Sequence, residues 1–258
     1  MSRNQIFIGN WKMHKTLAEA NEFLQGLSKG LSPQEKFIGL AVPYTLIYPL
    51  SKEIKETSIR IGAQNMNDAT SGAFTGEIAG NMLIDVGATF VLLGHSERRQ
   101  LFHENNEFIN HKVKKAVESG LQPVLCVGET LPEFNEKKTH EVIERQLTEG
   151  LKNLTSQELQ NLMIAYEPVW AIGNGQSADP EITQEVHYFC RQILTKLFEE
   201  KFADQVSILY GGSVSPINAS DLMAQPDIDG LLIGGASLSL ETFLEIVNDN
   251  YSKIQLEG

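Results

Sequence analysis

Short apolar runs alternate along the chain with longer segments in which apolar residues recur every three or four positions. The runs are brief and often β-branched, as is typical of strands that are buried on both faces of a parallel sheet. We therefore expect strands at residues 5–11, 37–42, 59–64, 90–93, 123–127, 162–166, 206–210 and 230–233.

Amphipathic helices are predicted between these strands, since their apolar residues share one helix face. Residues 180–200 also carry a start signal, with Asp179 as a cap and Pro180 in the first turn. The expected apolar faces are Phe23, Leu24, Leu27 and Leu31 in residues 18–31; Phe108, Ile109, Val113, Ala116 and Val117 in residues 105–119; and Val186, Phe189, Ile193, Leu197 and Phe198 in residues 180–200.

Eight strand–helix units in 258 residues average about 32 residues each, an ordinary size for a βαβ unit. No Pro/Ser-rich linker or change in composition divides the chain, so we expect one domain over residues 1–258. Such units form either a closed (β/α)8 barrel or an open doubly wound sheet. No GxGxxG follows a strand, and strand number and length favour the α/β fold with a closed barrel of parallel strands.

The composition narrows the function classes. The net charge of −12 argues against a general nucleic-acid binder or a polybasic membrane anchor, although it leaves a small anionic substrate open. Cys126 and Cys190 form no CxxC, so neither a disulfide scaffold nor a cysteine zinc site is expected. The sequence shows no signal-peptide core and no apolar stretch near 18 residues, and we expect a cytoplasmic protein.

In a barrel, functional residues gather where strands end. Reading the strand ends in order gives Asn10, Lys12, Gln64, Asn65, His95, Glu97, residues 126–129, Glu167, Gly211, Gly212, Ser213, Gly234 and Gly235. Glycine turns after the last two strands are typical of a phosphate site built from backbone N–H groups.

Two of these positions suggest acid–base chemistry. His95 follows Gly94 at an expected helix start, where the helix N-terminus should lower the pKa of the histidine and keep the ring neutral. Glu167 is followed by an apolar segment that should exclude water, which would raise the pKa of its carboxyl toward that of a general base. The apolar stretch from Pro168 to Gly175 has the composition of a lid with a hinge at each end.

The motifs GNWKM (9–13), GHSERR (94–99), AYEPVWAIG (165–173), YGGSV (210–214) and GGASL (234–238) occur in one order along the chain. With them the sequence resembles the triosephosphate isomerase family over residues 4–254. The resemblance implies a TIM barrel that interconverts D-glyceraldehyde 3-phosphate and dihydroxyacetone phosphate through an enediol(ate), in glycolysis and gluconeogenesis, with no cofactor and no metal. Asn174 and Gln176, at the second hinge, depart from the family's usual residues.

The resemblance also implies a role for each site residue. Glu167 would be the base, His95 the neutral electrophile, and Lys12 would stabilise the enediolate and bind the phosphate. The remaining implied roles are a lining position for Asn10, phosphate binding by Gly173, Ser213, Gly234 and Gly235, and an orienting role for Glu97.

A second region, residues 64–77, resembles the family's dimer loop. Phe74 is a large apolar residue in a polar loop, which indicates an anchor for a partner. We expect a homodimer in which Phe74 and Thr75 reach the other subunit near Lys12 and Cys126, and we expect neither nucleic acid nor membrane as a partner.

Two alternatives stay open. One is a phosphate-binding barrel with another reaction, which would need a different base or a Schiff-base lysine at a later strand end. The other is a non-catalytic scaffold, which would be expected to have lost Lys12, His95 or Glu167. The sequence offers no such late lysine and keeps all three residues.

Overall fold

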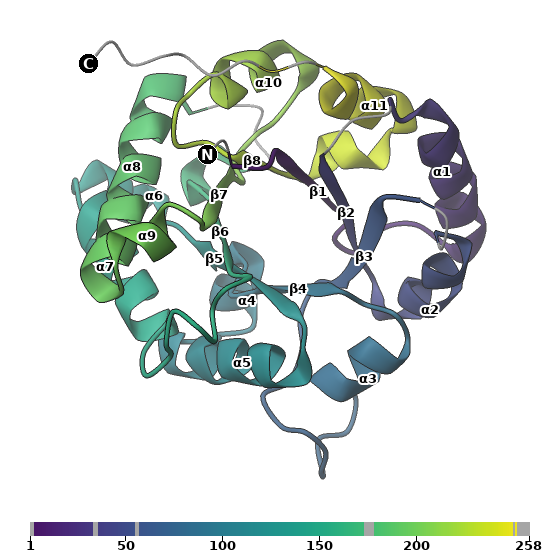
Figure 1. Ribbon diagram of the computed structural model, residues 1–258, viewed down its shortest axis with the longest axis horizontal. Coiled ribbons are helices and arrows are strands. Elements are labelled where there is room, and N and C mark those ends of the chain that lie inside the picture. Colours follow the sequence, from purple (N-terminus) through teal and green to yellow (C-terminus); the bar gives the residue numbers. More distant parts are fainter. Residues whose placement is uncertain (1–2, 33–35, 55–56, 173–177, 250, 252–258) are drawn as a thin grey trace.

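The computed structural model describes residues 3–32, 36–54, 57–172, 178–249 and 251. Within these residues a closed parallel barrel forms, and its first strand pairs with both the second and the eighth (Figure 1). The predicted closed barrel is therefore confirmed. The strands are β1 (Ile6–Asn10), β2 (Phe37–Val42), β3 (Ile59–Ala63), β4 (Phe90–Leu93), β5 (Gln122–Val127), β6 (Met163–Tyr166), β7 (Ser207–Tyr210) and β8 (Gly230–Ile233).

Helices surround the barrel, as Figure 1 shows in a view along its axis. They are α1 (Leu17–Gly30), α2 (Tyr44–Glu53), α3 (Gly80–Asp85), α4 (Ser96–Leu101), α5 (Asn106–Ser119), α6 (Leu131–Asn135), α7 (Thr139–Gly150), α8 (Pro180–Leu197), α9 (Glu200–Ala203), α10 (Pro216–Met223) and α11 (Leu240–Asn248), with the 3-10 helices η1 (Val169–Ala171) and η2 (Gly235–Leu238).

The apolar residues form two cores, one inside the barrel and one between the strands and the helices. Phe90 is a fully buried member of the inner core. A Cβ at Gly62 would lie 2.4 Å from its ring, and one at Gly39 would lie 3.0 Å from it. These two glycines on neighbouring strands therefore make the space that the Phe90 ring fills.

The predicted helices form, and the largest error in their bounds is at a C-terminus. Asp179 caps α8 as expected, because its side chain accepts hydrogen bonds from the N–H groups of Glu181 and Ile182. However, α8 ends at Leu197 rather than at residue 200, since Phe198 leaves the helical conformation with φ −127° and ψ −94°. The end was not predictable because residues 198–200 continue an apolar and acidic pattern that suits a helix.

The loop between β3 and α3 projects from the barrel below α3 in Figure 1. It contains Phe74, whose side chain is 51% exposed, and Thr75.

Candidate active site

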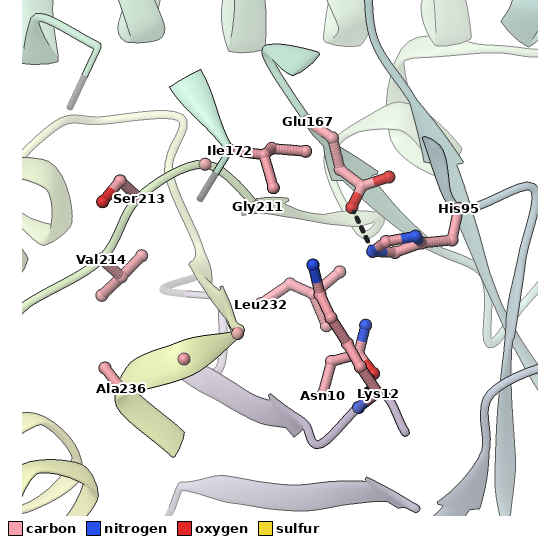
Figure 2. Close-up of a pocket in the computed structure, with 13 residues that line it drawn as sticks. Asn10, Lys12, His95, Glu167, Ile172, Gly211, Ser213, Val214, Leu232 and Ala236 are labelled. Atoms are coloured by element: carbon pink, nitrogen blue, oxygen red, sulfur yellow. Dashed lines mark hydrogen bonds and ion pairs between the residues drawn. The ribbon is translucent and has the colours of Figure 1, made fainter. Parts of the chain in front are cut away.

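The ends of the strands surround a cavity of about 210 Å³. This volume lies below the range of about 300–1,000 Å³ that is common for drug-sized ligands, so the cavity suits a small molecule. Its described lining is Asn10, Lys12, His95, Glu167, Ile172, Gly211, Gly212, Ser213, Val214, Leu232, Gly234, Gly235 and Ala236 (Figure 2).

Glu167 follows β6 and lies almost fully buried at the cavity wall. Its backbone N–H donates to the carbonyl of Val127, which fixes the end of β6 against β5. One carboxylate oxygen accepts the N–H of Ser96 at 3.0 Å, and the other lies 2.9 Å from Nε2 of His95 (Figure 2). The carboxylate is thus held at the start of α4 in this conformation.

Two glycines leave room for Glu167. A Cβ at Gly128 would lie 1.7 Å from the carbonyl oxygen of Glu167, and a Cβ at Gly211 would lie 2.9 Å from its Cγ. The sequence suggested only a phosphate turn for Gly211. Its close approach to the Cγ of Glu167 gives no signal in the sequence, because it depends on how two strand ends meet.

His95 lies at the first turn of α4, as predicted. Gly94 follows β4 with φ +73°, a left-handed conformation that glycine adopts without strain. His95 then caps the helix, because its Nδ1 accepts the N–H of Glu97 at 3.2 Å. Since a nitrogen that accepts a hydrogen bond carries no proton, this contact places the proton of a neutral ring on Nε2.

The protonation of His95 differs from the prediction in this conformation. Burial lowers the pKa of His95, but the carboxylate of Glu167, helped by Glu97, outweighs burial and raises the pKa above its ordinary value. The expectation of a lowered pKa was therefore wrong for this arrangement. It considered the helix N-terminus and left out a carboxylate at 2.9 Å from the ring.

Lys12 follows the end of β1 with φ +49°, a strained conformation for a lysine. Its N–H donates to Oδ1 of Asn10 at 3.1 Å, and its carbonyl accepts from Nε2 of Gln64 at 2.9 Å. Nζ forms an ion pair with Oε1 of Glu97 at 2.7 Å. Glu97 therefore contacts both Lys12 and His95, and Figure 2 shows the Lys12 ammonium pointing into the cavity.

The glycine turns lie across the cavity from His95. Figure 2 places Ser213 and Ala236 on the side opposite the histidine, and η2 opens at Gly235. The first N–H groups of a helix have no partner within that helix, so they can face an anion. The structure thus brings Ser213, Gly234 and Gly235 together, whereas Gly173, Asn174 and Gln176 lie outside the described residues.

The first hinge of the expected lid is anchored. The N–H of Val169 donates to the carbonyl of Glu129 at 3.1 Å, and Nε1 of Trp170 donates to Oε1 of the same residue at 2.8 Å. Trp170 also stacks on Phe134, with the ring centroids 4.3 Å apart. Burial raises the pKa of Glu129, although its hydrogen bonds to Trp170 and Tyr166 oppose the shift.

Several residues that line the cavity or hold its side chains were missed by the sequence analysis. Ser96 supplies the N–H that holds Glu167, and Ile172, Val214 and Leu232 form apolar walls. The pattern of side chains in a sequence does not indicate which backbone N–H group, such as that of Ser96, will donate to a catalytic side chain. The apolar residues resemble other residues of a buried strand or loop. Only their position along the chain, next to the predicted site residues, could have indicated that they line the cavity.

The cysteines behave as expected of packing residues. Both are buried and free, and burial raises the pKa of Cys190 to about 12 and that of Cys126 well above its ordinary value. Among the described residues, no group of three or more His, Cys, Asp or Glu side chains is placed to hold a metal ion. Within the same part of the chain, no helix has the length and apolar character needed to cross a bilayer.

The closed barrel carries a carboxylate, a histidine and a lysine at its strand ends, opposite glycine turns, and this end of the barrel is where (β/α)8 enzymes hold their active sites. The family model for triosephosphate isomerase matches residues 5–250 of the chain. The chain belongs to this family and is an isomerase.

Relatives named triosephosphate isomerase match over nearly their whole lengths. The protein of Protochlamydia amoebophila is 58% identical over 256 residues, which cover 99% of this chain and 97% of the relative. The protein of Endomicrobium trichonymphae is 48% identical, with 97% and 100% covered. The protein of Carboxydothermus hydrogenoformans is 47% identical, with 95% and 98% covered.

Proposed function

We propose that the chain interconverts D-glyceraldehyde 3-phosphate and dihydroxyacetone phosphate through an enediol(ate). The observation that carries this proposal is the cavity that joins Glu167, His95 and Lys12 to the turns at Ser213 and Gly235. An aldose–ketose interconversion needs one base for two adjacent carbons, and it needs donors where the oxygens gain negative charge.

Each residue has a role in this proposal. Glu167 turns away from the N–H of Ser96 and takes a proton from the carbon next to the carbonyl. His95, held at Nδ1 by the N–H of Glu97, donates its Nε2 proton to the substrate oxygens. The Lys12 ammonium stabilises the developing negative charge, and Asn10 holds the backbone of Lys12.

The phosphate lies against the glycine turns. Backbone N–H groups at Ser213, Gly234 and Gly235 bind it on the side opposite His95, and we expect Gly173 to add a contact from the lid. A lid that excludes water and holds the phosphate would protect the enediolate from losing it.

A coupled assay with glyceraldehyde 3-phosphate tests this function. We expect efficient turnover by the wild type and a fall of about 10²–10⁴-fold in Glu167→Gln, because the variant lacks the base. Glu158→Gln is the control, since Glu158 is an exposed carboxylate that bonds to Thr155. Equal activity in the wild type and Glu167→Gln would contradict the proposal.

We also infer that the chain forms a homodimer through the loop that carries Phe74 and Thr75. A second hollow of about 570 Å³ adjoins the cavity and shares Asn10, Lys12 and His95 with it. The exposed apolar side chains of Met13, Tyr44 and Phe102 line this hollow. The loop of a second copy would fill this hollow beside Lys12, whereas Cys126 is fully buried and out of its reach.

Sedimentation at micromolar concentration tests the dimer. We expect a mass of two chains for the wild type and of one chain for Phe74→Asp, because the charge would have to be buried in the hollow. Ile217→Asp is a matched control, since Ile217 is 91% exposed on α10, away from this loop. A wild-type mass of one chain would contradict the inference.

A cytoplasmic location and a single domain over residues 1–258 belong to the same proposal. Two buried thiols that are not paired suit a reducing compartment. Cell fractionation tests the location, and recovery of the protein in the membrane or secreted fraction would contradict it.

A further inference from the structure

Lys15 connects two loops of the candidate site. It lies between β1 and α1, three residues after Lys12, and has φ +72°. Its Nζ donates a hydrogen bond at 2.9 Å to the carbonyl of Leu238, the last residue of η2. The loop that carries Lys12 is therefore tied to the short helix that opens at the cavity.

The ammonium of Lys15 is held in place by two aromatic rings. Nζ lies 4.7 Å from the ring centroid of Phe23 and 5.2 Å from that of Trp11. Trp11 and Phe23 also contact each other edge to face, so the platform below the ammonium is rigid. A flexible lysine that is fixed in this way can hold the carbonyl of Leu238 at a defined position.

The other end of η2 is fixed from β1. Ser237 is fully buried, and both its N–H and its hydroxyl donate to the carbonyl of Gly234, at 2.9 and 2.7 Å. A Cβ at Gly9 would lie 3.0 Å from Cβ of Ser237, so β1 and η2 are in close contact. Because η2 spans four residues, a shift at Leu238 would move the N–H groups at its start.

We propose that Lys15 is a positioning residue for the phosphate group, acting through the C-terminal end of η2. A cation at the last carbonyl of a helix complements the partial negative charge there. The contact keeps the N–H groups of Gly234 and Gly235 aimed at the phosphate and keeps Lys12 at a fixed distance from them. This inference rests on the proposed function, since it assumes that the phosphate lies at η2.

Lys36 offers a matched control at the other end of the barrel. Its Nζ donates to the carbonyls of Val247 and Asp249, at the end of α11, at 3.0 and 2.5 Å. It also lies 5.3 Å from the ring centroid of Phe7 and 5.4 Å from that of Tyr251. Lys36 thus has the same kinds of contact as Lys15, but it precedes β2 and lies far from the cavity.

The test compares Lys15→Met, Lys36→Met and Lys15→Arg. For each protein, kcat and KM are measured with glyceraldehyde 3-phosphate and with unphosphorylated glyceraldehyde, and inorganic phosphate is titrated by calorimetry. For Lys15→Met we expect KM for the phosphorylated substrate and Kd for phosphate to rise roughly three- to tenfold. The ratio of kcat/KM for the phosphorylated substrate to kcat/KM for unphosphorylated glyceraldehyde should fall by a similar factor. Lys36→Met should leave that ratio and Kd unchanged, and Lys15→Arg should restore both.

Equal losses with both substrates would overturn the inference, because they would indicate a general structural defect. An unchanged Kd for phosphate in Lys15→Met would also overturn it. Thermal melting of the two Met variants shows whether their loss of stability is comparable. Should Glu167→Gln retain full activity, the proposed function would fail by itself, while the phosphate titration would still test Lys15.

Discussion

Gln64 offers a direct test of how the strained backbone of Lys12 is held. Its Nε2 donates to the carbonyl of Lys12 at 2.9 Å and to that of Ala41 at 3.0 Å, with Oδ1 of Asn10 at 3.3 Å. In Gln64→Leu the side chain keeps a similar size, but these hydrogen bonds are lost. The three acceptors then have no donor from this position.

The expected size of the effect follows from two opposing terms. The two shorter hydrogen bonds contribute about 1 kcal/mol each. The left-handed conformation of Lys12 costs about 1–2 kcal/mol, which becomes available when the loop relaxes. We therefore expect the free energy of unfolding to fall by at most about 1 kcal/mol, whereas kcat/KM falls about 10–30-fold, because roughly 1.4 kcal/mol of lost transition-state stabilisation is tenfold in rate.

The assay combines steady-state kinetics with urea unfolding of Gln64→Leu and Gln184→Leu. Gln184 is the control because it also makes two amide hydrogen bonds, to the side chain and the N–H of Asp227 at 2.7 and 2.9 Å. It lies on α8 and contacts the segment before β8, away from the cavity. The reasoning would be refuted if both variants lost the same stability and Gln64→Leu kept wild-type kcat/KM.

Three further predictions concern charges and packing. NMR titration should give His95 a pKa above its ordinary value in the wild type and a lower one in Glu167→Gln, because the carboxylate is what opposes burial; an unchanged pKa would argue against this. Asp227→Asn should lower the free energy of unfolding at pH 7 by about 1.5–3 kcal/mol, since Nε of Arg191 donates to the carboxylate at 2.6 Å. Although burial raises the pKa of Asp227, Arg191 and other donors outweigh burial and lower this pKa. The difference in unfolding free energy between wild type and variant should therefore be complete above pH 4 and should disappear as the pH falls through the lowered pKa. A constant difference down to pH 2 would contradict this prediction. Gly128→Ala should lower both stability, by at least about 1–3 kcal/mol, and kcat, because its Cβ would meet the carbonyl of Glu167; wild-type kinetics and melting would contradict the packing argument.

The fold was predictable because the apolar runs coincide with buried strands. The ranges 37–42, 90–93 and 230–233 match β2, β4 and β8, and the others differ by one residue at one or both ends. The closure of the barrel was an inference from unit number and chain length. The end of α8 was missed, since no glycine or proline marks Leu197 as a helix terminus.

The candidate site was predictable to the extent that its polar and charged side chains lie at the ends of strands. The cavity joins Asn10, Lys12, His95 and Glu167 because each lies at or just after the end of a parallel strand, and parallel strands end on one face of the barrel. The contacts that hold these residues were not predictable. The N–H of Ser96, the amide of Gln64 and the ammonium of Lys15 all act on residues far away in sequence, and such pairings depend on the folded loops.

The raised pKa of His95 bears on when the histidine is neutral. The ring has two influences that favour neutrality, burial and the N–H that Glu97 donates to Nδ1, and one strong influence against it, the carboxylate of Glu167 at 2.9 Å. In the proposed reaction Glu167 leaves His95 to reach the substrate carbon. Its departure removes the larger of the two carboxylate charges that favour the imidazolium, and burial, the largest influence on the pKa, then outweighs Glu97. The neutral histidine that the sequence suggested is thus expected when the base is turned toward the substrate, where a neutral donor is needed.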